Sequence, residues 1–130
     1  MNRNVFNSAV MGLVFIGLTE VGATSLEDEK QIAAVTQSYY AIKHINNPDK
    51  KVQLAAVKQN YHAIQYIKNP DKEVQLAAVE QDARAIKCIE NPDEELQLAA
   101  VKQSYHAIRY IENPSIKATK VAHAEMMKEY

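Results

Sequence analysis

The chain has 130 residues, 47% of them hydrophobic and 24% charged, so it can form one domain and is not disordered throughout. A formal net charge of −1 excludes a global electrostatic attraction to nucleic acid or to an acidic membrane. A single cysteine, Cys88, excludes an internal disulfide framework and says little about the redox compartment.

Residues 1–25 form an apolar N-terminal segment that differs from the rest of the chain. Arg3 precedes the apolar run 9–18, and the small residues of Val21-Gly22-Ala23 follow. This order is typical of a secretory signal peptide, and the run is short of the ~20 residues that span a bilayer. The alternative is a helix that caps the first repeat, although a cap usually keeps a polar outer face. A signal peptide over 1–23 predicts an exported or periplasmic protein, and a cap predicts a cytoplasmic one.

The rest of the chain is a repeat with a period of 22 residues. Residues 48–69 and 92–113 are identical at 16 of 22 positions. Four units cover 26–113, and residues 114–130 drift from the pattern as a degenerate C-terminal capping helix does. A fixed period of this size marks a stacked array, because one unit cannot bury its own apolar surface. The repeated dipeptides are Asn47-Pro48, Asn69-Pro70, Asn91-Pro92 and Asn113-Pro114.

Each unit carries signals for two short helices. In the second unit they predict helices over about 48–59 and 61–68. Asn69 is the expected N-cap of the following helix, with Pro70 at its first position and Asp71 near the positive end of its dipole. We therefore predict an all-α fold, a right-handed α-solenoid of stacked helix-turn-helix repeats.

Apolar spacing predicts how the helices pack. The first helix of a unit is apolar on two sides, as expected of a helix between two neighbours. On the second helix, Ala63, Ile64 and Ile67 form the inner face, with Tyr61 beside them. Two rows of glutamines also run through the units. We expect these to bond to backbone groups of adjacent units, with Gln59 half-buried.

The phrase NPDKxVQLAAVKQNYHAIQYI resembles an uncharacterised family of short α-helical repeats found in bacterial and viral proteins. The resemblance covers roughly 26–113 and lies in the Asn-Pro, Gln-Leu-Ala-Ala-Val and Ala-Ile-x-x-Ile elements. It implies a helical fold and no activity, because that family is a domain of unknown function. The pattern is also similar to tetratricopeptide-like and armadillo-like solenoids, whose units are longer, and this analogy favours protein binding.

The face of the second helices opposite the Ala-Ile face is the candidate binding surface. Tyrosine, histidine and arginine recur there, and these residue types are common at binding hot spots. The third unit has Ala83 and Cys88 where its neighbours have tyrosine. This loss predicts a dip flanked by Tyr61, Tyr66, Tyr105 and Tyr110, with Arg84 and Lys87 at its edge, which could accept an acidic or aromatic group of a partner. The alternatives are a solvated face with partly packed tyrosines, and repeat drift. The candidate binding residues are Tyr40, His62, Tyr66, Arg84, Lys87, Cys88, His106, Arg109 and Tyr110.

The residues support binding better than catalysis. The chain has no phosphate-binding loop, no His-Glu-x-x-His and no paired cysteine motif, so we expect no enzyme activity, no cofactor and no metal site. A protein or peptide partner is the first expectation, and oligomeric state is left open. Single-stranded nucleic acid is the alternative, disfavoured because units 70–91 and 92–113 each carry −2 while 48–69 carries +3. An inhibitory module from a virus or mobile element is a third interpretation.

Overall fold

The computed structural model describes residues 25–130 and shows an α-solenoid, with no strand in that range. Each unit consists of an α-helix followed by a six-residue 3-10 helix, and a final α-helix closes the array. The apolar segment interpreted as a signal peptide or cap falls on 1–24 and lies outside the described residues. The elements are α1 (Leu26–Gln37), η1 (Tyr39–His44), α2 (Lys50–Gln59), η2 (Tyr61–Tyr66), α3 (Lys72–Gln81), η3 (Ala83–Cys88), α4 (Glu94–Gln103), η4 (Tyr105–Tyr110) and α5 (Ile116–Met127).

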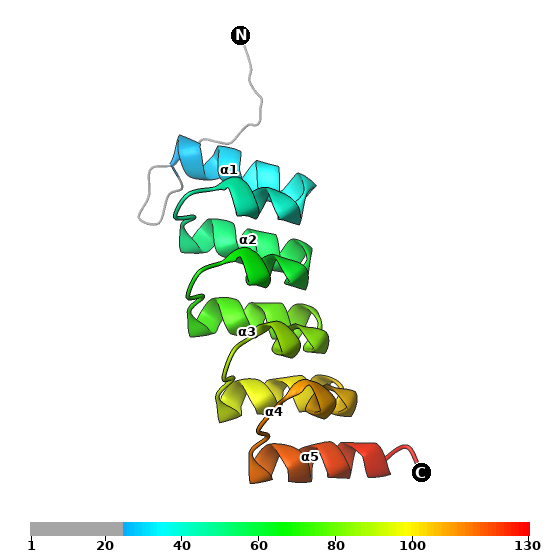
Figure 1. The fold of residues 1–130 in the computed structure, drawn as a ribbon. Coiled ribbons are helices and arrows are strands. Elements are labelled where there is room, and N and C mark those ends of the chain that lie inside the picture. The colour runs from blue at the N-terminus through cyan, green and yellow to red at the C-terminus, as the bar shows by residue number, and fades with distance from the viewer. Residues whose placement is uncertain (1–24) are drawn as a thin grey trace.

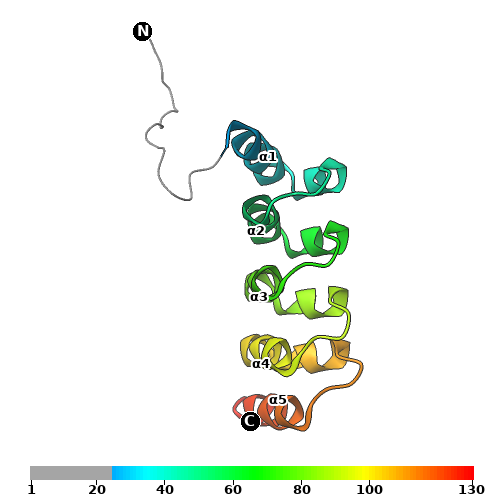
Figure 2. The ribbon, with the colours of Figure 1, turned by 90° about the vertical axis from the view of Figure 1, so that its left-hand side faces the viewer.

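The helices form two parallel columns (Figures 1 and 2). The α-helices stack on one side in chain order, and the 3-10 helices stack on the other. Each α-helix contacts the next α-helix, and each 3-10 helix contacts the next 3-10 helix. Contacts therefore join consecutive units only, as in other repeat arrays. Among the described residues no helix is both long and apolar enough to cross a membrane.

The starts of the α-helices lie two residues later than the Asn-Pro dipeptides predict. Asp71, not Asn69, is the N-cap of α3, and its carboxylate accepts a hydrogen bond from the Val74 N–H at 3.1 Å. Asn69 instead adopts a left-handed conformation with φ of 48°, which asparagine tolerates better than most residues. Pro70 lies before the helix and not inside it. Asparagine and aspartate are about equally good caps, so residue type alone does not choose between them.

The second element of each unit is tighter and shorter than the predicted helix. Residues 61–66, not 61–68, form η2, and its helical type is 3-10. Asn60 begins it in an extended conformation, and the Asn60 side chain accepts from the His62 N–H at 2.9 Å. Because 3-10 runs longer than a few residues are uncommon, the chain leaves the helix at Ile67.

The core lies between the two columns. Val52, Ala56 and Val57 of α2 are fully buried, and their equivalents in α3 and α4 are buried too. The predicted inner face of η2 is confirmed, because Ala63, Ile64 and Ile67 are all buried. Alanine at the position of Ala56 lets adjacent α-helices approach closely, and branched side chains fill the space between columns.

Glutamines join the units, as predicted. Gln81 of α3 accepts a hydrogen bond from the Tyr61 N–H of the preceding unit at 3.0 Å. Gln97 is buried and accepts from the Ser115 N–H of the following unit at 2.7 Å. The expectation for Gln59 was wrong, because this side chain is exposed at the C-terminal end of α2.

Candidate functional site

We call the column of 3-10 helices, η1 to η4, the outer row. It carries every candidate binding residue. One position of this row is exposed in all four 3-10 helices, and it holds Lys43, Gln65, Lys87 and Arg109. Tyr66 and Tyr110 are only half-exposed, because each also packs against the adjoining core. The predicted stripe is therefore a surface of mixed character, with cations outermost and aromatic rings partly packed.

Two aromatic groups lie in the first half of this row. The rings of Tyr40 and Tyr66 meet edge to face at 5.2 Å, and the Lys43 amine donates to the Tyr40 hydroxyl at 3.0 Å. That hydrogen bond is the largest cause of a lowered Tyr40 pKa. His62 stacks on Tyr61 with ring centroids 4.1 Å apart. Contacts within the chain therefore already occupy Tyr40, His62 and Tyr66.

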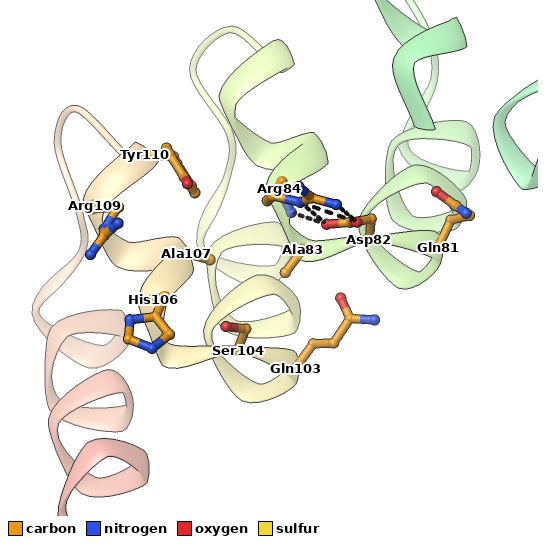
Figure 3. A pocket seen from close by; sticks show the side chains of 10 residues that line it. All are labelled: Gln81, Asp82, Ala83, Arg84, Gln103, Ser104, His106, Ala107, Arg109 and Tyr110. Carbon is orange, nitrogen blue, oxygen red and sulfur yellow. Dashed lines mark hydrogen bonds and ion pairs between the residues drawn. The ribbon is translucent and has the colours of Figure 1, made fainter. Parts of the chain in front are cut away.

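A groove of about 520 Å³ opens between η3 and η4 (Figure 3). Arg84 and Asp82 form one side, and Tyr110, His106 and Arg109 form the other. Small residues of two consecutive units, Ala83 and Ala107, contribute to the floor of the groove. This volume lies within the range typical of ligand-binding pockets. The lining residues are Gln81, Asp82, Ala83, Arg84, Gln103, Ser104, His106, Ala107, Arg109 and Tyr110.

The corresponding groove one unit earlier is half as large. It lies between η2 and η3 and has a volume of about 260 Å³. Its six lining residues each precede a lining residue of the larger groove by one repeat. The equivalent of Ala83 there is Tyr61, a buried side chain with 6% exposure. The larger groove has alanine at this position, and it also extends along η4 to Ala107, Arg109 and Tyr110.

Charge in the groove is unevenly neutralised. Asp82 holds Arg84 through three hydrogen bonds, the shortest 2.6 Å from Nη2, and the ion pair lowers the pKa of the Asp82 carboxyl. The Arg84 guanidinium also lies 5.7 Å from the Tyr61 ring centroid. Among residues 25–130 no carboxylate pairs with Arg109. The groove therefore has one fixed, neutralised cation and one available cation.

The dip predicted from the sequence is only partly as expected. Ala83 does line a groove and Tyr110 borders it, but Tyr61, Tyr66 and Tyr105 do not line it. The reason is that the groove lies between the third unit and the fourth, so Tyr61 contacts Arg84 from the opposite side. The Tyr105 hydroxyl turns away and donates to Glu129 at 3.1 Å.

Of the candidate binding residues, Lys87 lies at the margin of the groove between η3 and η4, and Cys88 lies outside it. The Lys87 amine is 5.8 Å from the Tyr110 ring centroid, and Cys88 lines two other surface pockets. Burial raises the pKa of the Cys88 thiol more than the nearby Lys87 lowers it, so the thiol is not activated. Sequence reasoning missed Asp82. The signal was an acid two residues before the arginine, where other units have asparagine or serine.

The described part of the chain contains no cluster of three or more histidine, cysteine or carboxylate residues that could hold a metal ion. Comparison with family models, curated proteins and solved structures finds no match. The period and the sequential helix contacts thus identify the chain as an α-helical repeat, without assigning a family.

Proposed function

We propose that the chain is a non-catalytic protein-interaction module that binds a protein or peptide through its outer row of 3-10 helices. The observation that carries the proposal is the groove between η3 and η4, with Arg109 at its edge and no described carboxylate neutralising it. Arginine beside tyrosine in a concave site is the composition of a binding hot spot. The array supports the groove on both sides, because η3 packs on η2 as well as η4, and η4 packs on α5.

We also propose that the chain is related to the family of short helical repeats that its Gln-Leu-Ala-Ala-Val and Ala-Ile-x-x-Ile elements resemble. Solenoids of this type present extended surfaces to partners, which is an argument by analogy. Localisation depends on residues 1–23. A signal peptide there would direct export, and a capping helix would leave the protein in the cytoplasm.

The test is affinity capture with the full chain and two charge-reversal variants. Arg109→Glu changes the exposed cation of η4, and the matched control Lys102→Glu changes an exposed cation of α4 in the same unit. We expect a protein captured by the wild type and by Lys102→Glu to be lost with Arg109→Glu. An identical set of proteins from all three baits would contradict the proposal. Capture of single-stranded RNA alone, with a steep salt dependence, would replace it by nucleic-acid binding.

A further inference from the structure

We propose that the groove between η3 and η4 receives an aromatic side chain flanked by an acidic side chain, both from a peptide segment of the partner. This inference rests on the proposed function and names the ligand chemistry of that same site. Three independent features of the groove support it: the space beside Ala83, the polar groups around that space, and the charge at its rim.

The space beside Ala83 lies at the repeat position where the other units carry a tyrosine ring. Tyr39, Tyr61 and Tyr105 occupy the same repeat position in the other units. Where Tyr61 is present, the groove volume is about 260 Å³, and where alanine replaces it, about 520 Å³. The floor of the larger groove includes the buried alanines Ala83 and Ala107. A partner's ring can therefore lie where the repeat normally supplies its own.

One wall of the groove offers a flat surface for that ring. Asp82 holds the Arg84 guanidinium at two of its nitrogens, Nε at 3.0 Å and Nη2 at 2.6 Å, so the plane of the group is fixed. A planar guanidinium held in this way stacks on aromatic faces, as Arg84 already does with Tyr61 at 5.7 Å. Little side-chain entropy remains to be lost when a second ring binds there.

Among residues 25–130 the backbone N–H of Ala83 also has no acceptor. In the preceding groove Gln81 accepts from the Tyr61 N–H at 3.0 Å. In the larger groove the equivalent glutamine, Gln103, donates to the Glu80 carbonyl at 2.8 Å. Among the described residues no acceptor meets the Ala83 N–H. A peptide carbonyl that enters with the aromatic side chain can accept this hydrogen bond.

Charge at the opposite wall favours an acid beside the ring. Arg109 is exposed and has no carboxylate partner among residues 25–130, and Lys87 lies near the same Tyr110 ring. The only carboxylate lining the groove, Asp82, is already neutralised by Arg84. An incoming carboxylate can therefore pair with Arg109 without meeting an unpaired anion, and arginine binds carboxylates through two parallel hydrogen bonds.

The experiment measures binding of a blocked fluorescent peptide, Gly-Ser-Glu-Tyr-Glu-Ser-Gly, to the full chain by fluorescence anisotropy. Two control peptides have serine in place of the tyrosine or lysine in place of both glutamates. We expect saturable binding of the first peptide with a Kd below ~1 mM, and binding weakened roughly tenfold or more for each control. Equal binding of all three peptides, or no binding of any, would overturn the inference.

Variants of the chain locate that binding. Ala83→Tyr restores the residue of the other units, so it should fold as the wild type does, which a thermal melt verifies. We expect it to weaken peptide binding roughly tenfold or more by refilling the groove, and Arg109→Gln to weaken it similarly, whereas Lys102→Gln should have no effect. Unchanged binding to Ala83→Tyr would overturn the groove assignment.

The two proposals can fail separately. If Arg109→Glu abolishes capture of the protein partner while Ala83→Tyr leaves it intact, the outer row binds but the groove does not receive the ring. If neither variant changes capture, the outer row is not the binding surface and both proposals fail.

Discussion

At the scale of single residues, aspartates cap the starts of α2, α3 and α4. Asp93 accepts from the Leu96 N–H at 2.9 Å, and the Lys72 amine lies 2.9 Å from its other oxygen. The first of these interactions is the larger cause of the lowered Asp93 pKa. A carboxylate in this position satisfies a free backbone donor and also interacts favourably with the helix dipole. Ser115 performs the capping role without a charge at the start of α5.

This difference makes Asp93 a test of the capping account. We expect Asp93→Ala to destabilise the array by about 1 kcal/mol near neutral pH, and Asp93→Ser to destabilise it much less, because serine still caps. The pKa of Asp93 is lower in the folded state than in the unfolded state. The ionised carboxylate therefore stabilises the fold above the unfolded pKa of about 4, and this stabilisation is lost as the pH falls through the folded-state pKa. Thermal melts at about pH 7 and about pH 3 should therefore show the wild type falling further than Asp93→Ser. An equal fall in both proteins would show that the Asp93 carboxylate does not contribute.

At the scale of elements, ion pairs connect the starts of adjacent α-helices. Lys50 lies 3.3 Å from Asp71 and 3.0 Å from Glu73, and Lys72 makes the equivalent contacts with the next unit. The positions of Lys50 and Glu73 carry opposite charges at every interface between units. At the first and last interfaces the acid comes first and the lysine second. In chain order the position pairs are Asp28 and Lys51, Lys50 and Glu73, Lys72 and Glu95, and Glu94 and Lys117. The sequence therefore places opposite charges at the end interfaces as well, in the reverse order.

Charge exchange tests this matching. Lys72→Glu places three acidic groups together between α3 and α4, and we expect Tm to fall by on the order of 2 °C at low salt. Adding Glu95→Lys should recover most of the loss, and ~1 M salt should remove the difference, because these groups are exposed and easily screened. Additive effects of the two substitutions in a double-mutant cycle would mean that the contact makes no energetic contribution.

The sequence predicted which elements form better than it predicted the residues at which they begin and end. The 22-residue period and the apolar spacing identified the stack, the inner face of η2 and the inter-unit glutamines. The helix starts were misplaced because Asn69 and Asp71 are both good caps, and the choice depends on a backbone conformation that residue type does not reveal. The 3-10 form of η2 was not predicted, because apolar spacing alone does not separate a short 3-10 helix from a short α-helix.

The candidate site was partly predictable for the same reason. Comparison of the copies pointed to Ala83 and Arg84, because a lost side chain is visible in the sequence. The pairing of Arg84 with Asp82 and the availability of Arg109 depend on distances between side chains, which the repeat pattern does not specify.

At the scale of the whole molecule, the two columns divide the work. The α-helices stack through small and branched side chains, and the ion pairs between units join them. The 3-10 helices carry exposed aromatic and cationic side chains. Corresponding grooves lie between η2 and η3 and between η3 and η4, and the one that has Ala83 in place of a tyrosine is the larger. A regular array can in this way carry a single distinct binding position.

The most direct test of the binding surface is hydrogen exchange of the full chain, measured with and without the protein partner captured by the Arg109-dependent assay. We expect partner binding to slow exchange in 83–88 and 105–110, while exchange in α3 and α4 changes little on the opposite side. Protection confined to the α-helical column, or none in either 3-10 helix, would contradict the assignment of the binding surface.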